Sequence, residues 1–375
     1  MSLETLIEIS RHYGANPDYV LAGGGNTSWK DSETLYVKSS GMSLADVTAD
    51  SFVKMDRSAL ARIWEKTYPE SPDERESAVL ADMMAAKKIG EEQKRPSVEA
   101  LLHDLLPFSF VVHLHPALVN GLTCAQQGEA LASEIFGADA IWIPITNPGY
   151  ILARTVKTAM DEYSATQGKP AAIIILQNHG VFVGDNSVDG IKEIYSEIMR
   201  KLGERVKRQP DFSGEKRFPA AAQINDTAAA EIARTLAELS GAAAFMQSAE
   251  ISALVKDRDS FAPVSSAFSP DHIVYAGSCP LFTSVLTAAA IQDVWKEHTD
   301  KTGRAAKIVA VKELGIFSAA ANEKTANLAL DLFKDTIKVA VYSESFGGPL
   351  FMTADKIDFI NNWEVERFRT NVLSK

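Results

Sequence analysis

The chain has 375 residues, 46% hydrophobic and 23% charged, which is the composition of an ordinary globular protein with room for about two domains. Its net charge of -11 and pI near 5.2 argue against nucleic acid or an anionic membrane as a partner, although a local site can still bind a small anion. The two cysteines form no C-x-x-C pair, and neither a signal peptide nor a membrane span is visible. These features predict a reduced, cytoplasmic protein.

Helical and strand-like patterns alternate along the first half of the chain, which predicts an α/β fold. We expect helices near residues 3–13, 74–89, 96–106, 150–166 and 187–207, and strands near residues 19–22, 35–37, 108–114, 141–143 and 171–176.

Residues 209–221 have the composition of a linker, with two Pro, one Gly and four charged residues. The sequence therefore predicts a first domain over residues 1–208 and a second, smaller α/β domain over residues 222–375. In the second domain we expect helices near 224–240, 283–300 and 322–343, and a strand near 307–311.

Two segments resemble each other across this boundary. Residues 171–182 and 306–317 share an apolar pattern when Gly180 is aligned with Gly315, which places Leu314 opposite His179. One hypothesis is that the second domain is a degenerate copy of the first without its metal site. The alternative is that two strand-turn-strand-helix units look alike by chance.

Three histidines are the candidate metal ligands. His113 and His115 flank one residue of a predicted strand, so the strand's period of two places both imidazoles on one face. His179 ends another apolar strand, and three histidines would leave an open position on a divalent ion. The alternative for the His-x-His pair alone is two half-buried, hydrogen-bonded rings. Among the other histidines, His103 is the best supporting group, although a surface or packing role is favoured.

Glu99 follows Pro96 and Ser97 near a predicted helix start, so it is either a first-turn carboxylate or a general base beside the metal. Residues 23–28 (GGGNTS) and 38–41 (KSSG) are the candidate anion-binding loops, because glycines let backbone amides approach a phosphate. A tight turn would also explain either loop taken singly.

Together these segments resemble the class II aldolase/adducin family. The matching motifs, in family order over residues 1 to about 208, are GNTS (25–28), KSSG (38–41), PSVE (96–99), HLHP (113–116) and NHG (178–180). The resemblance implies a three-layer αβα fold with a mixed or antiparallel central sheet.

The resemblance also implies roles for individual residues. His113, His115 and His179 would bind Zn²⁺, and Glu99 would be the catalytic acid/base. The substrate phosphate would contact Asn26, Ser40, Gly41, Ser97 and Lys38. Lys38 matches a lysine typical of the family's epimerases. Val98 replaces a serine common in its aldolases and would remove one phosphate contact.

The C-terminal part resembles the aldolase portion of bifunctional rhamnulose-1-phosphate aldolase/alcohol dehydrogenase proteins. The resemblance lies in residues 269–274, 315–317 and 362–366. Because the chain stops at Lys375 without a G-x-x-x-G-x-G segment, we expect an aldolase-type protein without dehydrogenase activity.

The expected reaction is the cleavage of a ketose phosphate, with L-rhamnulose 1-phosphate as the first candidate, to dihydroxyacetone phosphate and an aldehyde. The alternatives are an epimerase or decarboxylase on the same scaffold, or a non-catalytic, adducin-like interaction module. Glu99 favours an aldolase, because the epimerases tend to carry aspartate there. The family resemblance also implies a homo-oligomer. The sequence leaves open the stereochemistry, the identity of the metal and the role of the second domain.

Overall fold

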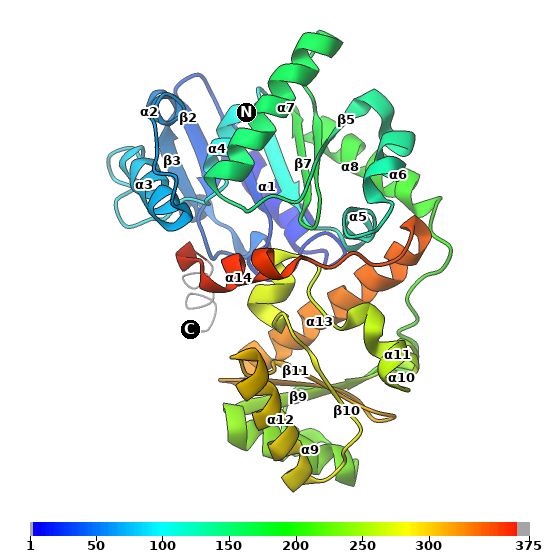
Figure 1. The fold of residues 1–375 in the computed structure, drawn as a ribbon. Helices are drawn as coiled ribbons and strands as arrows, with labels where there is room; N and C mark the ends of the chain where they lie inside the picture. The colour runs from blue at the N-terminus through cyan, green and yellow to red at the C-terminus, as the bar shows by residue number, and fades with distance from the viewer. Residues whose placement is uncertain (1–2, 366–375) are drawn as a thin grey trace. The chain divides into compact units, whose positions relative to one another are not determined.

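A computed structural model describes residues 3–365 of the chain. It divides into two compact units (Figure 1). Within the described part, the first unit comprises residues 3–123, 127–205 and 363–365, and the second comprises residues 124–126 and 206–362. Glu366, the last residue of the C-terminal resemblance, and the end of the predicted second domain lie outside the described residues.

The first unit is built on a seven-stranded sheet in the order β3-β2-β1-β4-β7-β6-β5. The strands are β1 (Asn26–Lys30), β2 (Thr34–Lys38), β3 (Phe52–Asp56), β4 (Phe110–Leu114), β5 (Ala140–Ile143), β6 (Ile173–Leu176) and β7 (Gly180–Asp185). β5 and β6 are parallel, and the other neighbours are antiparallel. The sheet is therefore mixed and largely antiparallel, as the sequence predicts.

Helices cover both faces of this sheet and make the predicted three layers. They are α1 (Leu3–Gly14), α2 (Arg57–Ile63), α3 (Pro72–Ala85), α4 (Ala100–Leu105), α5 (Ala117–Thr123), α6 (Gly128–Phe136), α7 (Tyr150–Gln167) and α8 (Val188–Gly203). One apolar core lies between the sheet and α2, α3, α4 and α7. On the other face, α1 and α8 meet through the rings of Tyr13 and Tyr195, whose centroids are 5.0 Å apart.

The second unit is built on a five-stranded sheet in the order β10-β11-β12-β9-β8. Its strands are β8 (Lys216–Phe218), β9 (Ala242–Gln247), β10 (Leu281–Thr283), β11 (Ile308–Val311) and β12 (Gly315–Ala320). Its helices are α9 (Thr227–Ser240), α10 (Ala249–Leu254), α11 (Arg258–Phe261), α12 (Ala288–Thr302), α13 (Glu323–Ser343) and α14 (Ala354–Asn362), with a π-helical segment at His272–Ala276. The stretch expected to be a linker contains β8, which pairs with β9.

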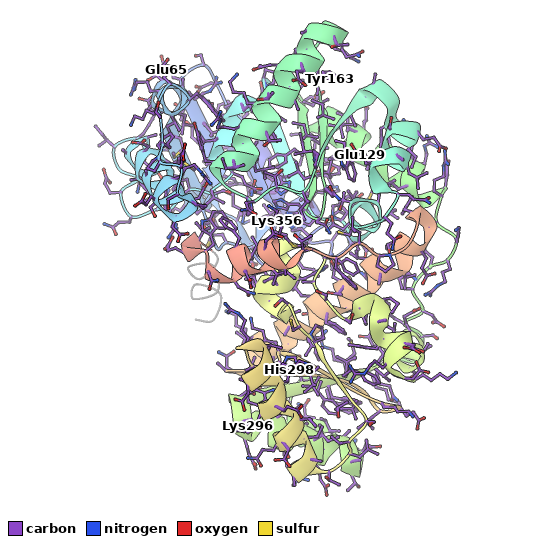
Figure 2. All side chains as sticks on the ribbon, in the orientation of Figure 1. Glu65, Glu129, Tyr163, Lys296, His298 and Lys356 are labelled. Atoms are coloured by element: carbon purple, nitrogen blue, oxygen red, sulfur yellow. The ribbon has the colours of Figure 1, made fainter. Side chains whose placement is uncertain are left out.

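Surface and core follow the expected amphipathic pattern. The charged side chains of Glu65, Glu129 and Lys296 are exposed on their elements (Figure 2). Ser187 caps α8, since its Oγ accepts from the Gly190 amide at 3.0 Å. None of the helices formed by the described residues has the length and apolar character that a membrane crossing requires.

Two predicted elements are wrong. Residues 19–22 form turns rather than a strand: the Tyr19 amide donates to Asn16 O and the Gly24 amide to Leu21 O, and Ala22 has φ 52. The helix expected from Pro96 begins at Ala100 instead.

The late start of α4 has a tertiary cause. Pro96 forms a β-bridge with Ser39, and the Ser97 amide donates to Lys38 O, so these residues extend the sheet rather than opening a helix.

Candidate metal centre

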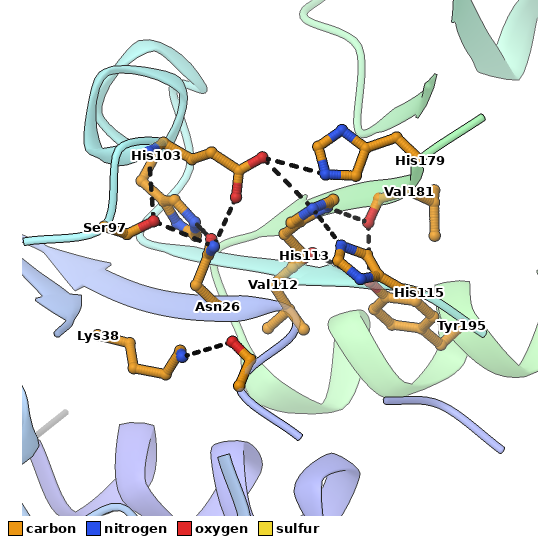
Figure 3. Close-up of polar contacts among 12 residues, drawn as sticks. Asn26, Lys38, Ser97, His103, Val112, His113, His115, His179, Val181 and Tyr195 are labelled. Carbon is orange, nitrogen blue, oxygen red and sulfur yellow. Dashed lines mark hydrogen bonds and ion pairs between the residues drawn. The ribbon is translucent and has the colours of Figure 1, made fainter. Parts of the chain in front are cut away.

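Two strand ends bring three histidines together. β4 and β7 are antiparallel neighbours, and His113 of β4 lies opposite Phe182. His115 comes directly after β4, and His179 lies in the turn that leads from β6 into β7. Because β7 starts at this turn and runs antiparallel beside β4, the C-terminal end of β4 and the turn lie next to each other at the ends of the strands (Figure 3).

The three rings form a compact cluster. Their centroids are 4.7 Å apart for His113 and His115, 5.0 Å for His113 and His179, and 5.1 Å for His115 and His179. One ligand nitrogen of each ring lies within 4.8 Å of the other two, and the Nε2 atoms of His113 and His115 are 2.9 Å apart. Three imidazole nitrogens at this spacing could hold one divalent ion.

The hydrogen bond that Nδ1 of His113 makes determines which ring nitrogen is available to this cluster. Its Nδ1 lies 3.1 Å from Val181 O, which only accepts, so Nδ1 carries the proton and the lone pair is on Nε2. Burial lowers the pKa of His113 well below its usual value, because desolvation penalises the charged imidazolium. His113 is therefore neutral, which is the form that binds a metal.

The backbone around the cluster leaves no room for extra atoms. The His113 ring stacks on Phe182 with centroids 3.9 Å apart. A Cβ at Gly180 would lie 2.5 Å from Leu114 O and 2.7 Å from His115 Cδ2. Glycine at this position therefore lets the turn approach the end of β4.

The turn that carries His179 is held by its own backbone. The Gln177 amide donates to Ile143 O at 3.0 Å, and the Asn178 amide donates to Thr123 O at 3.1 Å. Asn178 has φ 56, a left-handed conformation that asparagine tolerates better than most residues. These constraints fix the direction in which His179 leaves the turn.

The Glu99 side chain points toward the histidines and accepts no capping hydrogen bond from the helix that follows it. Glu99 is the N-cap residue of α4, with φ -91 and ψ 10, and its side chain makes no capping bond, so the first-turn interpretation is wrong. Its Oε1 lies 3.5 Å from His113 Nε2 and 3.6 Å from His179 Nε2. Oε2 accepts a hydrogen bond of 2.6 Å from Asn26 Nδ2.

The charge of Glu99 indicates what the cluster can hold. Burial raises the pKa of this carboxyl, whereas positive charge at the histidine cluster and the hydrogen bond from the Asn26 amide lower it, and the net shift is downward. The buried Oε1 has no hydrogen-bond partner among the described residues. A buried carboxylate oxygen and three imidazole nitrogens that face one another fit a divalent metal ion together with a bound substrate.

A chain of buried hydrogen bonds, which the sequence did not predict, orients Glu99. Ser28 Oγ lies 2.7 Å from His103 Nδ1, and His103 Nε2 bonds Asn26 Oδ1. The Asn26 amide then donates to Glu99 and, at 3.2 Å, to Ser97 Oγ. Burial lowers the pKa of His103 to about 3, so the ring is neutral and donates from one nitrogen only.

His103 is fully buried, so of the surface or packing role favoured from the sequence, the surface role is wrong. An available signal was its position four residues after Glu99, which places both side chains on one face at the start of α4.

Lys38 joins two loops. Its Nζ donates to Met42 O at 2.5 Å and to Gly23 O at 3.4 Å, which ties the glycine run before β1 to the loop after β2. The ammonium group is therefore used to hold backbone.

The other predicted phosphate contacts fall into two places. Asn26 and Ser97 lie beside Glu99 through the hydrogen bonds given above. Ser40 and Gly41 belong to the loop after β2, where the Ser40 amide donates to Arg95 O and Gly41 has φ 81. The loop after β2, with Ser40 and Gly41, and the segment before α4, with Ser97, are therefore neighbours joined by backbone hydrogen bonds.

Comparison with known proteins places this site in a family. Residues 4–200 match the Class II Aldolase and Adducin N-terminal domain. YuxG of Bacillus subtilis (strain 168), described as an uncharacterized oxidoreductase, is 26% identical over 230 residues, which are 58% of this chain and 32% of YuxG. The chain therefore spans about a third of that relative's length.

Solved structures with a similar fold include the N-terminal class II aldolase domain of a conserved protein from Thermoplasma acidophilum. It is 26% identical, covers 54% of this chain and 93% of its own, and has a TM-score of 0.46. An L-fuculose-1-phosphate aldolase from Thermus thermophilus is 15% identical, covers 54% and 89%, and has a TM-score of 0.34. Since the family match covers more than half of its residues, this chain belongs to the class II aldolase/adducin family.

Proposed function

We propose that this chain is a divalent-metal-dependent aldolase that cleaves a ketose phosphate, with zinc as the metal. The observation that carries the proposal is the ionised, partly unsatisfied carboxylate of Glu99 facing the nitrogens of His113, His115 and His179. A divalent ion bound there would act as a Lewis acid and stabilise negative charge on the substrate's ketone and hydroxyl oxygens.

Glu99 is the proposed proton carrier. When the carbon–carbon bond of the ketose breaks, the hydroxyl on the departing carbon would lose its proton and become the aldehyde carbonyl, while the electron pair would remain on the carbon next to the ketone. Glu99, after taking up one proton, would deliver it to that carbon. In the synthetic direction the ionised carboxylate would take the proton away. Asn26 holds Oε2 of Glu99 at 2.6 Å, so Oε1 is the oxygen left for this transfer.

The proposed substrate is a phosphorylated sugar, and L-rhamnulose 1-phosphate is the first candidate, giving dihydroxyacetone phosphate and lactaldehyde. Asn26, Ser40, Gly41 and Ser97 remain the proposed phosphate contacts. For Asn26 this role would be shared, because its amide already donates to Glu99 and Ser97. Lys38 would act indirectly, by holding the two loops in place.

Other functions are alternatives for experiment to decide. Epimerisation and decarboxylation of a sugar phosphate would use the same metal and the same carboxylate. An adducin-like interaction module would have no need of Glu99 oriented by a buried hydrogen-bond chain. Homo-oligomerisation, cytoplasmic location and the absence of dehydrogenase activity remain predictions.

The test is metal-dependent product release. Zinc-loaded protein is incubated with L-rhamnulose 1-phosphate, dihydroxyacetone phosphate is measured, and chelated protein is the blank. We expect release only with metal, and a loss of about 10²–10⁴-fold in kcat in Glu99→Gln with bound zinc retained.

The matched control is Glu91→Gln, a buried glutamate that pairs with Lys94 and Lys54, which should keep its activity. Zinc-loaded protein that releases no triose phosphate from any ketose phosphate but epimerises or decarboxylates one would replace the aldolase proposal.

A further inference from the structure

The two sheets share one topology. In the first unit, β1-β4-β7-β6-β5 are consecutive neighbours, with three antiparallel pairs followed by the parallel pair β6–β5. In the second unit, β8-β9-β12-β11-β10 are consecutive neighbours with the same sequence of pairings. Chain order matches as well, since a long helix precedes β6 (α7) and β11 (α12), and another follows β7 (α8) and β12 (α13).

The best-matching stretch aligns without a gap from the end of α7 to the start of α8. Gly168 and Gly303 are both left-handed C-caps, with φ 66 and 72. Asn178 and Glu313 both have positive φ in the hairpin turn, at 56 and 59. A positive φ is uncommon outside glycine, so its recurrence at one position of the same turn is specific.

The same backbone hydrogen bonds hold both turns. The first turn amide donates to the last residue of the parallel neighbouring strand: Gln177 to Ile143 in the first unit, and Lys312 to Thr283 in the second. The second amide donates to a residue at or just after a helix end: Asn178 to Thr123, and Glu313 to Val255. The third amide donates to the preceding strand and closes the turn: His179 to Leu176, and Leu314 to Val311.

The strand register extends the match to the metal ligands. Val181 lies opposite Leu114, and Ile316 lies opposite Met246, so Leu114 corresponds to Met246. A Cβ at Gly315 would lie 2.8 Å from Met246 O, as one at Gly180 would lie 2.5 Å from Leu114 O.

Counting one residue to either side of Met246, the positions of His113 and His115 are occupied by Phe245 and Gln247. The position of His179 is occupied by Leu314.

Apolar rings fill the corresponding place in the second unit. The ring of Phe245 packs against that of Phe317, with centroids 4.6 Å apart, as the ring of His113 packs against that of Phe182. Phe218 lies opposite Phe245 in the sheet and stacks on it at 6.2 Å.

We propose that the second unit is a copy of the first unit's five-stranded core in which Phe245, Gln247 and Leu314 have replaced the three metal ligands. Among the described residues, the three-histidine cluster of the first unit is then the one proposed metal site. If histidines were placed at these three positions, the backbone of the second unit would hold them in the geometry that binds a second divalent ion. This inference rests on topology and register and is independent of the proposed reaction.

The experiment restores the three ligands. Phe245→His/Gln247→His/Leu314→His protein and its parent are loaded with zinc, freed of loose metal and analysed for zinc per chain by mass spectrometry. We expect one more zinc per chain in the variant. The control Phe245→His/Gln247→His/Lys312→His adds as many histidines but places the third at the position of Gln177, and it should gain none.

Replacing buried Phe245 can disturb folding, so a second pair of variants keeps the test decisive. Gln247→His/Leu314→His changes only two half-buried positions, and we expect it to bind zinc at least tenfold more tightly than Gln247→His/Lys312→His in the second unit. The proposal is overturned if folded variants, checked by circular dichroism, gain no more zinc than their controls. Since the readout is the gain over the parent, failure of the His113 site would be seen separately in the parent.

Discussion

At the scale of single residues, the orientation of Glu99 depends on a side chain that does not touch the histidine cluster. His103 Nε2 donates to Asn26 Oδ1, so its Nδ1 accepts from Ser28 Oγ, and the Asn26 amide orients Glu99. A neutral imidazole with one donor and one acceptor matches a hydroxyl on one side and an amide oxygen on the other. The same chain therefore sets both the ring's tautomer and the direction of the Asn26 amide.

We predict that His103→Phe lowers the free energy of unfolding by about 2–4 kcal/mol, because it leaves two buried polar groups without partners. It should also lower kcat while leaving bound zinc unchanged, since no metal ligand is altered. Urea unfolding and metal analysis measure both effects. His12→Phe, at an exposed histidine of α1, is the control, and an equal loss of stability there would contradict the prediction.

The pKa of His103 predicts a pH dependence for the metal-free protein. The folded pKa is about 3, and the unfolded value is about 6.5. Above pH 6.5 the ring is neutral in both states. Below pH 6.5 only the unfolded chain takes up the proton, so stability falls by about 1.4 kcal/mol per pH unit from this group.

Between pH 6.5 and 5, the difference in unfolding free energy between the wild type and His103→Phe should therefore shrink by about 2 kcal/mol. Urea unfolding at several pH values measures it. Parallel curves for the two proteins would show that His103 is not buried in its neutral form.

At the scale of elements, the β6–β7 turn positions one proposed ligand, His179, against the end of the neighbouring strand β4. Gly180→Ala would place a Cβ 2.7 Å from His115 Cδ2 and 2.5 Å from Leu114 O, so the ring or the turn must shift. We predict at least a tenfold loss of zinc affinity, because ligands tolerate little displacement.

Titration calorimetry measures this affinity. Gly203→Ala is the matched control, since a Cβ there has no atom within 4 Å among the described residues. Equal zinc affinity in the two variants would mean that the turn adapts without cost to the site.

At the scale of the whole molecule, metal binding should stabilise the first unit only. Zinc at a free concentration 100 times its Kd adds about 2.7 kcal/mol to the stability of a protein that binds it only when folded. For a unit of this size we expect Tm to rise by about 5–10 °C, measured by calorimetry with and without chelator. The second unit, whose corresponding positions are Phe245, Gln247 and Leu314, should melt at the same temperature in both conditions.

The control for this shift is His113→Ala/His179→Ala, in which zinc should leave both transitions unchanged. A zinc-dependent shift of the same size in that variant would place the binding site elsewhere in the chain.

The sequence by itself determined the α/β class, most helices, and the position of the three histidines relative to their own strands. His113 lies in β4 and His179 in a strand-ending turn, because local hydrophobic periodicity and turn residues encode these features. The ordered set of five motifs was sufficient to predict the family, which the match over residues 4–200 confirms.

Only the tertiary structure decided how distant segments pair. The bond between His103 and Asn26 joins residues 77 apart, and the extended backbone at Pro96 depends on Ser39 of another segment. β8 is three residues long with a polar composition, so it becomes a strand only because β9 offers it an edge. Local periodicity carries no information about such partners, because their energy comes from contacts that exist only after the chain has folded.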